Sequence, residues 1–190
     1  MKTQHIVPFT LLTVLLLMLQ GSVSAQNLEK LNEDNGYRIF QIGSKYDNLK
    51  DSLLPLSLNN ATTIAYKFIG SDTSLQNIAG VKPFIIHVLF DFSNNLVSIS
   101  AFLFLTNNGR NFEKRTDELF SKLKKYFLNR YGSNYTTSNF DDDQICSGCS
   151  GLIWKTEKVT FTLKIVSEKN MEWRRIDVTY TKTGFFKEGD

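Results

Sequence analysis

The sequence has few of the side chains on which enzymatic chemistry most often depends. Its 190 residues include 2 histidines, 2 cysteines and 3 prolines. His5 lies in an N-terminal segment that we expect to be removed, so any Ser-His, Cys-His or multi-histidine metal mechanism would have to use His87. His87 itself falls in an apolar β-rich run, where we expect a packed or half-exposed side chain. Because the chain also lacks a glycine-rich phosphate loop and a Gly-x-Ser-x-Gly motif, we predict no catalytic residue, no cofactor and no metal site.

The chain also lacks a strong excess of charge of one sign. It has 22 Lys and Arg against 19 Asp and Glu, a net charge of +3. Removal of Lys2 with the N-terminal segment leaves 21 against 19, a net charge of +2. This balance argues against a nucleic-acid partner or an anionic lipid surface. Aromatic residues are abundant instead, with 15 Phe and 7 Tyr, and they favour an aromatic-filled, β-rich core.

Long apolar runs are missing outside the N-terminus. There, Lys2 precedes an apolar stretch over 9–19 that is shorter than the roughly 20 residues of a membrane span. The small residues Val23-Ser24-Ala25 follow, which predicts a signal peptide over 1–25, cleaved between Ala25 and Gln26. The alternative is an N-terminal membrane anchor. We expect an exported protein, periplasmic or extracellular, with a single domain over 26–190 and no membrane span after cleavage.

The two cysteines form the one local motif with chemistry in it, Cys146-Ser147-Gly148-Cys149. A zinc site would need two more ligands, and no second cysteine or histidine pair exists. A thiol exchange site would favour a cationic neighbour, whereas three aspartates precede this motif. A local disulfide between Cys146 and Cys149 suits an oxidising, exported setting and is the interpretation that we adopt, with free or labile thiols and redox chemistry as alternatives.

The segment 111–131 is the clearest helix in the sequence. Asn111 is expected to cap its start, and Gly132 to end it in a left-handed turn. A shorter helix is predicted over 45–54, closed by Pro55. The apolar side chains of the long helix recur at helical spacing and form one broad stripe, which must be covered: Phe112, Leu119, Phe120, Leu123, Tyr126, Phe127 and Tyr131.

Two apolar runs, 84–92 and 96–105, predict a β-hairpin with its turn at Ser93-Asn94-Asn95. In the second run, Phe102 and Phe104 fall on one face of the strand. Ile99 and every second residue before and after it fall on the opposite face. A strand that is apolar on both faces is either covered twice or meets a partner. We therefore predict Phe102 and Phe104 as a protein or dimer contact. The alternative is that the long helix covers them.

The remaining segments complete an α+β fold with an antiparallel sheet. Residues 26–35 are expected to be a loose start. Further strands are predicted over 37–42, 63–69, 152–156, 159–166 and 173–182, with an edge strand over 135–139. The order of elements suggests two helix-plus-three-strand pseudo-repeats packed side by side.

Short motifs in this chain resemble those of small exported bacterial envelope proteins. Phe40-x-x-Gly43, followed by Leu49-Lys50 on a short helix, is similar to the opening of many of them. Tyr126, Tyr131-Gly132 and Trp154 look like the tyrosine-glycine and strand tryptophan of one such group. The layout resembles the β-lactamase-inhibitor-protein and outer-membrane assembly lipoprotein type, in which a helix pair lies against an antiparallel sheet. This resemblance implies binding to proteins or to the envelope, without a known reaction.

These observations lead to a functional expectation. We expect a non-enzymatic binding or structural module of the cell envelope or exterior, with a protein partner or a homodimer as its contact. The alternative is a small exported enzyme, either a hydrolase or a thiol redox protein that uses Cys146 and Cys149. A third candidate is a small lipid or other hydrophobic ligand held between helix and sheet.

Overall fold

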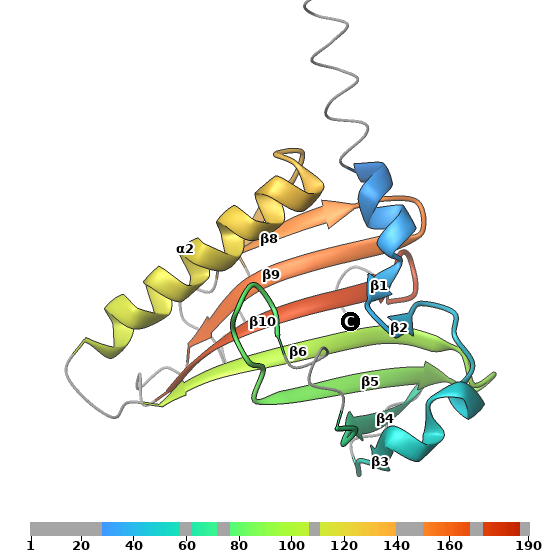
Figure 1. The fold of residues 1–190 in the computed structure, drawn as a ribbon. Coiled ribbons are helices and arrows are strands. Elements are labelled where there is room, and N and C mark those ends of the chain that lie inside the picture. Colours follow the sequence, from blue (N-terminus) through green and yellow to red (C-terminus); the bar gives the residue numbers. More distant parts are fainter. Residues whose placement is uncertain are drawn as a thin grey trace, which may run out of the picture.

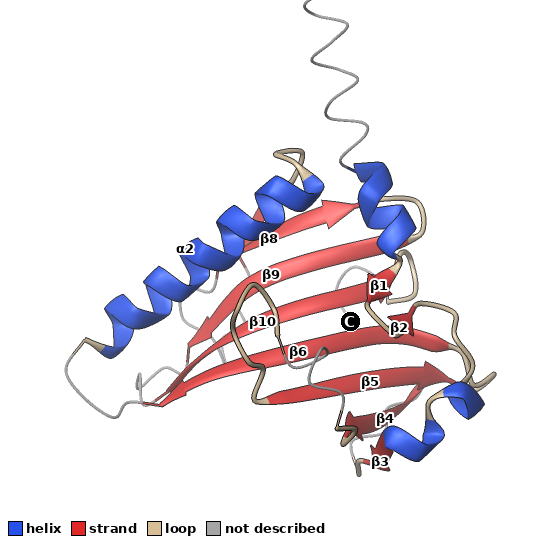
Figure 2. Ribbon diagram, in the orientation of Figure 1, coloured by secondary structure: helices blue, strands red, loops and turns tan. Residues whose placement is uncertain are grey.

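The computed structural model describes residues 28–57, 62–71, 77–106, 111–139, 150–167 and 173–186. These residues form an α+β protein in which an antiparallel sheet of eight strands lies beside a separate two-stranded hairpin (Figure 1, Figure 2). The hairpin consists of β1 (Gly36–Tyr37) and β2 (Phe40–Gln41). The large sheet consists of β3 (Leu53–Pro55), β4 (Thr63–Phe68), β5 (Ile85–Asp91), β6 (Leu96–Thr106), β7 (Thr136–Asn139), β8 (Ser150–Lys155), β9 (Val159–Ser167) and β10 (Trp173–Lys182).

The sheet is built from two four-strand halves. Its strand order is β3-β4-β5-β6-β10-β9-β8-β7, and all described pairings are antiparallel. Each half is an up-and-down meander, and the last strand of each half, β6 or β10, lies at the centre. Short 3-10 turns precede the first half and the long helix precedes the second. The pseudo-repeat suggested by the sequence therefore appears in the strand order, with four strands in each half where we expected three.

The long helix α2 (Phe112–Tyr131) matches the predicted segment 111–131. It ends at Gly132, whose φ of 78° favours glycine and whose N–H donates to the Leu128 carbonyl at 2.9 Å. Its start differs from expectation. Asn111 has a left-handed φ of 82°, and its side chain makes no capping hydrogen bond. Its backbone carbonyl nevertheless accepts the Arg115 N–H at 3.0 Å, so the first turn still closes.

The short helix predicted over 45–54 is shorter and differently wound. Two 3-10 turns, Tyr46–Asn48 and Lys50–Ser52, occupy most of this range, and the edge strand β3 begins at Leu53. Pro55 ends the short strand β3 at the edge of the sheet, a position where its missing N–H leaves no gap in a ladder between two strands. We expected Pro55 to end a helix, whereas in the structure Pro55 lies in an edge strand.

A helical segment over 28–34 replaces the loose start that we expected. Leu31 is fully buried, and Asn35 and Gly36 then turn the chain into β1 with positive φ angles of 43° and 138°. The strand predicted over 37–42 is this hairpin, β1 and β2, with its turn at residues 38–39. The hairpin and the helical segment lie against the same face of the sheet as α2 (Figure 1).

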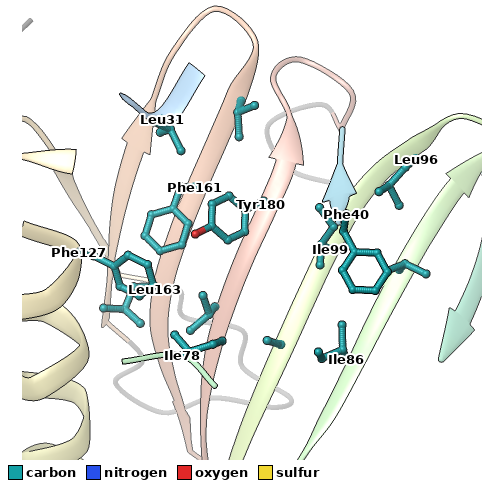
Figure 3. Packing of buried hydrophobic residues seen from close by; sticks show 14 of the residues in the cluster. Leu31, Phe40, Ile78, Ile86, Leu96, Ile99, Phe127, Phe161, Leu163 and Tyr180 are labelled. Carbon is teal, nitrogen blue, oxygen red and sulfur yellow. The ribbon is translucent and has the colours of Figure 1, made fainter. Parts of the chain in front are cut away.

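The hydrophobic core fills the space on this side of the sheet, which we call the covered face. α2 packs across the covered face against β10 and β6, and its Phe127 packs on Phe161 of β9 with the ring centroids 4.4 Å apart. Figure 3 shows the buried side chains converging from the strands, α2 and the hairpin. Buried strand residues of the covered face include Ile86, Val88, Ile99, Ala101, Trp154, Phe161, Leu163, Val178 and Tyr180. Within the described ranges, no helix has the length and apolarity needed to cross a membrane.

Candidate functional site

The second face of the sheet, which we call the open face, carries the predicted contact residues Phe102 and Phe104. Successive residues of a strand alternate between faces, so these two lie opposite to the buried Ile99, Ala101 and Leu103 of β6. The helix α2 packs on the covered face. It therefore does not cover Phe102 or Phe104, which was the alternative left open by the sequence.

Three phenylalanines meet at one end of the open face. Phe84 and Phe104 lie edge to face with ring centroids 5.4 Å apart, and their side chains are 76% and 37% exposed. Phe102, two residues before Phe104 in β6, packs on His87 of β5 with the ring centroids 5.0 Å apart. In the described part of the chain, most large apolar side chains are buried or half-buried, so two exposed phenylalanines in mutual contact are a candidate contact surface.

Arg175 of β10 is held over these rings. Its guanidinium carbon lies 4.7 Å from the centroid of Phe102 and 5.7 Å from that of Phe104, within cation–π range. It also donates two hydrogen bonds to Asp177, from Nε at 2.5 Å and from Nη2 at 3.1 Å. This fork holds the guanidinium in one orientation, because two parallel bonds fix a planar group better than one.

Asp177 is a buried carboxylate that is paired on both sides. Lys164 of β9 approaches it at 3.9 Å, and Arg175 holds it from its own strand. Burial raises the pKa of Asp177, while the two cations act in the opposite direction. A buried carboxylate with these partners fixes the side chains around it, since its removal would leave the two neighbouring cations without their shared counter-charge.

His87 is a neutral, packed member of the same group. Burial lowers the pKa of His87, and the nearby Lys67 and Arg175 lower it further. Its Nε2 is buried and makes no hydrogen bond to the described residues. Asp91, on the same strand, instead accepts hydrogen bonds from Asn95 and Ser93 in the hairpin turn. We call the set Phe84, His87, Phe102, Phe104 and Arg175 the aromatic–cationic patch.

Hydroxyl side chains occupy the middle of the open face. Ser98 pairs with Thr181, and Ser100 with Thr179, each through hydroxyl oxygens 3.1 Å apart across the β6–β10 seam. Farther along, threonines of β9 and β10 line a shallow hollow of about 860 Å³ together with Ile153 and Phe186. The open face therefore combines an apolar, cationic end with a hollowed end lined by both hydroxyl and apolar side chains.

Other residues singled out by the sequence lie elsewhere. Cys146 and Cys149 fall outside the described residues, as do Ala25 and Gln26, so the expected disulfide and the cleavage site remain predictions. Arg130, on the basic side of α2, pairs with Asp34 through Nη2 at 2.6 Å. In the described part of the chain, no three His, Cys, Asp or Glu side chains lie together as a metal site would require.

The sequence pointed to two residues of the patch as a contact and missed three. Alternation along one strand was enough to put Phe102 and Phe104 on one face. Phe84, His87 and Arg175 join them through pairing across strands, for example Arg175 with Phe104. To predict these contacts one must know that β6 and β10, which are distant in sequence, are neighbours in the sheet.

Comparison with known proteins adds no relative to this description. No protein-family model, no curated protein and no solved structure matches the chain.

Proposed function

We propose that this chain is an exported, non-enzymatic binding module whose open face recognises an acidic, apolar segment of a protein partner. The observation that carries the proposal is the aromatic–cationic patch. Its exposed phenylalanines offer apolar contact area, and its arginine is already fixed in place by Asp177. Interface hot spots are enriched in aromatic and arginine side chains of this kind.

The charges of the patch favour a partner with carboxylates. Three cationic side chains, Lys67, Lys164 and Arg175, lie in or beside the patch, and Asp177 is the carboxylate among them. A partner segment with Asp or Glu flanking an aromatic or aliphatic anchor would complement both the charge and the apolar surface. The proposed export of the protein is inferred from the signal-like pattern of its N-terminal segment.

A second copy of the chain is a less suitable occupant. In a two-fold symmetric dimer, the same patch would face itself, so Arg175 and Lys164 of both copies would share one interface. Like charges brought together at an interface lower its affinity. We therefore expect the isolated mature protein to be a monomer that binds a different protein.

The test is selection from a displayed library of random peptides, followed by affinity measurement. We expect enriched peptides to be acidic with an aromatic or aliphatic anchor, and to bind less tightly as ionic strength rises. The double variant Phe84→Ser/Phe104→Ser should weaken binding by about 30-fold, the effect of losing about 2 kcal/mol at a hot spot.

A matched control comes from the same strand hairpin. Phe92 is also exposed, at 67%, but lies at the opposite end of β5 from Phe84. Phe92→Ser should leave peptide affinity unchanged, and all variants should keep the wild-type circular dichroism spectrum. The proposal fails if the selection enriches no peptide, or if enriched peptides bind the double variant as tightly as the wild type.

A further inference from the structure

A second candidate site lies on the covered face, away from the aromatic–cationic patch. A cavity of about 400 Å³ opens between the helical segment 28–34, the β1–β2 hairpin, the C-terminal part of α2 and residues 77–78. Phe127, Ile78 and Tyr180, which line it, converge in Figure 3. Its volume falls in the range of pockets that hold small molecules.

The floor of the cavity is a connected polar network. Tyr131 donates its hydroxyl hydrogen to Asp34 at 3.0 Å, and its oxygen lies 3.0 Å from the hydroxyl of Tyr180. Arg130 donates to the same carboxylate from Nε at 2.7 Å. Burial raises the pKa of both Tyr131 and Tyr180, so the two phenols stay neutral. The floor is therefore satisfied and fixed, and its charges are already paired.

The rim of the cavity carries a cation that is not paired in this way. Arg38 reaches the backbone carbonyl of Asn77 at 3.4 Å and lies over the ring of Tyr37 at 5.7 Å. Within the described residues it has no ion pair with a carboxylate. Glu33, also on the rim, is held by Lys30 at 3.1 Å, so Arg38 is the lining charge left for a ligand.

The backbone places Arg38 there against its preference. Arg38 has a φ of 56° at the turn of the β1–β2 hairpin, where glycine or asparagine would adopt the left-handed region more readily. The described chain has five non-glycine residues with positive φ. Two of them, Arg38 and Ala79, lie in the two turns that border this cavity, and a third, Asn35, lies at the junction between the helical segment and β1. Backbone strain of this kind is common at ligand sites. Here the strained turn places the guanidinium of Arg38 at the cavity.

The remaining wall groups define the chemistry of the ligand. The cavity is also lined by Gln41, Asn77, Tyr37 and Tyr126, which is 39% exposed. The amide oxygen of Asn77 already accepts the Gly80 N–H, so its amide nitrogen is the group left to donate. Amide and hydroxyl groups both donate and accept hydrogen bonds, which suits a ligand with several hydroxyls. One guanidinium suits one carboxylate, which it can bind through two parallel bonds.

We propose that this cavity binds a small hydroxylated carboxylate, a sugar acid. Its carboxylate sits on the guanidinium of Arg38, and its hydroxyls face Gln41, Asn77 and Tyr126. The site is separate from the open face, so this proposal does not depend on the proposed protein partner and can be tested independently of it. It also differs from the hydrophobic ligand considered from the sequence, because the lining of this cavity is mainly polar.

Saturation-transfer NMR on the mature protein tests this with glucuronate and gluconate as probes. Glucose, which lacks the carboxylate, and acetate, which lacks the hydroxyls, are the matched control ligands. We expect a signal from the acids, competition between them, and little signal from either control. Arg38→Asn, which tolerates the left-handed turn, should weaken binding of the acids at least tenfold, whereas Arg115→Gln on the exposed side of α2 should not.

Three results would overturn the proposal. One is the absence of a signal from both acids at about 10 mM, which would nearly saturate a site with a Kd of about 1 mM. Another is equal binding of glucose, which would remove the role of the carboxylate. The last is unchanged binding in a folded Arg38→Asn variant, and Arg38→Gln repeats the measurement if the asparagine variant is unstable.

Discussion

Tyr131 connects the last turn of α2 to the sheet through a single oxygen atom. Its hydroxyl lies within hydrogen-bond distance of both Asp34 and Tyr180, and its ring packs on Phe161 at 5.3 Å. Removal of one partner from a buried pair leaves the other unsatisfied, at about 1–3 kcal/mol. This one residue therefore joins the helical segment 28–34, α2 and β10.

The buried phenols predict a loss of stability at alkaline pH. Above pH 10 the unfolded chain releases tyrosine protons that Tyr131 and Tyr180 keep in the folded state, because burial raises the pKa of both. The folded state then binds more protons than the unfolded state, so the free energy of unfolding falls as pH rises, by up to about 1.4 kcal/mol per pH unit for each phenol.

Comparison of Tyr131→Phe with the wild type isolates this effect. The variant should be less stable at pH 8 by about 1–3 kcal/mol, and the gap should narrow above pH 10 because the variant has one fewer phenol to ionise. Urea denaturation at several pH values measures it, with Tyr126→Phe on the same helix as a control. Parallel pH profiles for Tyr131→Phe and the wild type would contradict the prediction.

At the scale of elements, two tight turns build the rim of the cavity. Residues 78–81 form a hairpin turn in which Ala79 and Gly80 have φ angles of 53° and 80°, as in a type I′ turn. Ile78 and Val81 exchange backbone hydrogen bonds of 2.8 and 2.9 Å across it. The Asn77 side chain accepts the Gly80 N–H at 2.5 Å, which ties the turn to the carbonyl that Tyr37 and Arg38 contact.

Alanine is strained in the left-handed region. We therefore expect Ala→Gly changes at two positions to alter the free energy of unfolding in opposite directions. Ala79→Gly should stabilise the protein by up to about 1 kcal/mol, because glycine relieves the strained φ. Ala65→Gly, at a buried position in β4, should destabilise it by about 0.5–1 kcal/mol. Urea midpoints of the two variants measure the difference, and destabilisation by Ala79→Gly would show that the turn is not strained.

The elements differ in how far the sequence could predict them. The helix α2 was predictable because its apolar stripe repeats over 20 residues, long enough to dominate local signals. Residues 45–54 are followed by Pro55, a helix stop signal, but they span too few turns for the pattern to separate two 3-10 turns from a helix. The segment 28–34 was missed because Leu31 is the one residue there that is fully buried, and tertiary packing holds the helix.

The candidate sites depend on pairing that local patterns do not contain. Alternation in β6 placed Phe102 and Phe104 on one face, which is a local property. The cavity joins Asp34, Arg38 and Asn77 with Arg130 and Tyr180, which come from four separate parts of the chain. No spacing among these residues is informative until the fold brings them together.

At the scale of the whole molecule, one sheet separates two chemically different surfaces. The open face presents apolar and cationic groups suited to a protein segment, and the covered face presents a mainly polar cavity suited to a small ligand. Both draw on β10: Arg175 faces the patch, and Tyr180 faces the cavity. A rigid central strand therefore positions side chains for both surfaces at once.

The seam between β6 and β10 predicts that the two halves of the chain cannot fold apart. On the covered face, register pairs across it join buried residues, such as Ile99 with Tyr180 and Ala101 with Val178. Separation would expose two long apolar strand edges and would also break the contact of Asp34 with Arg130. We expect fragments 26–106 and 111–190 to be unfolded or aggregated alone and to form a folded complex when refolded together. Circular dichroism and size-exclusion chromatography measure this, and a folded monomer of either fragment alone would instead show that each meander is an independent unit joined at β6 and β10.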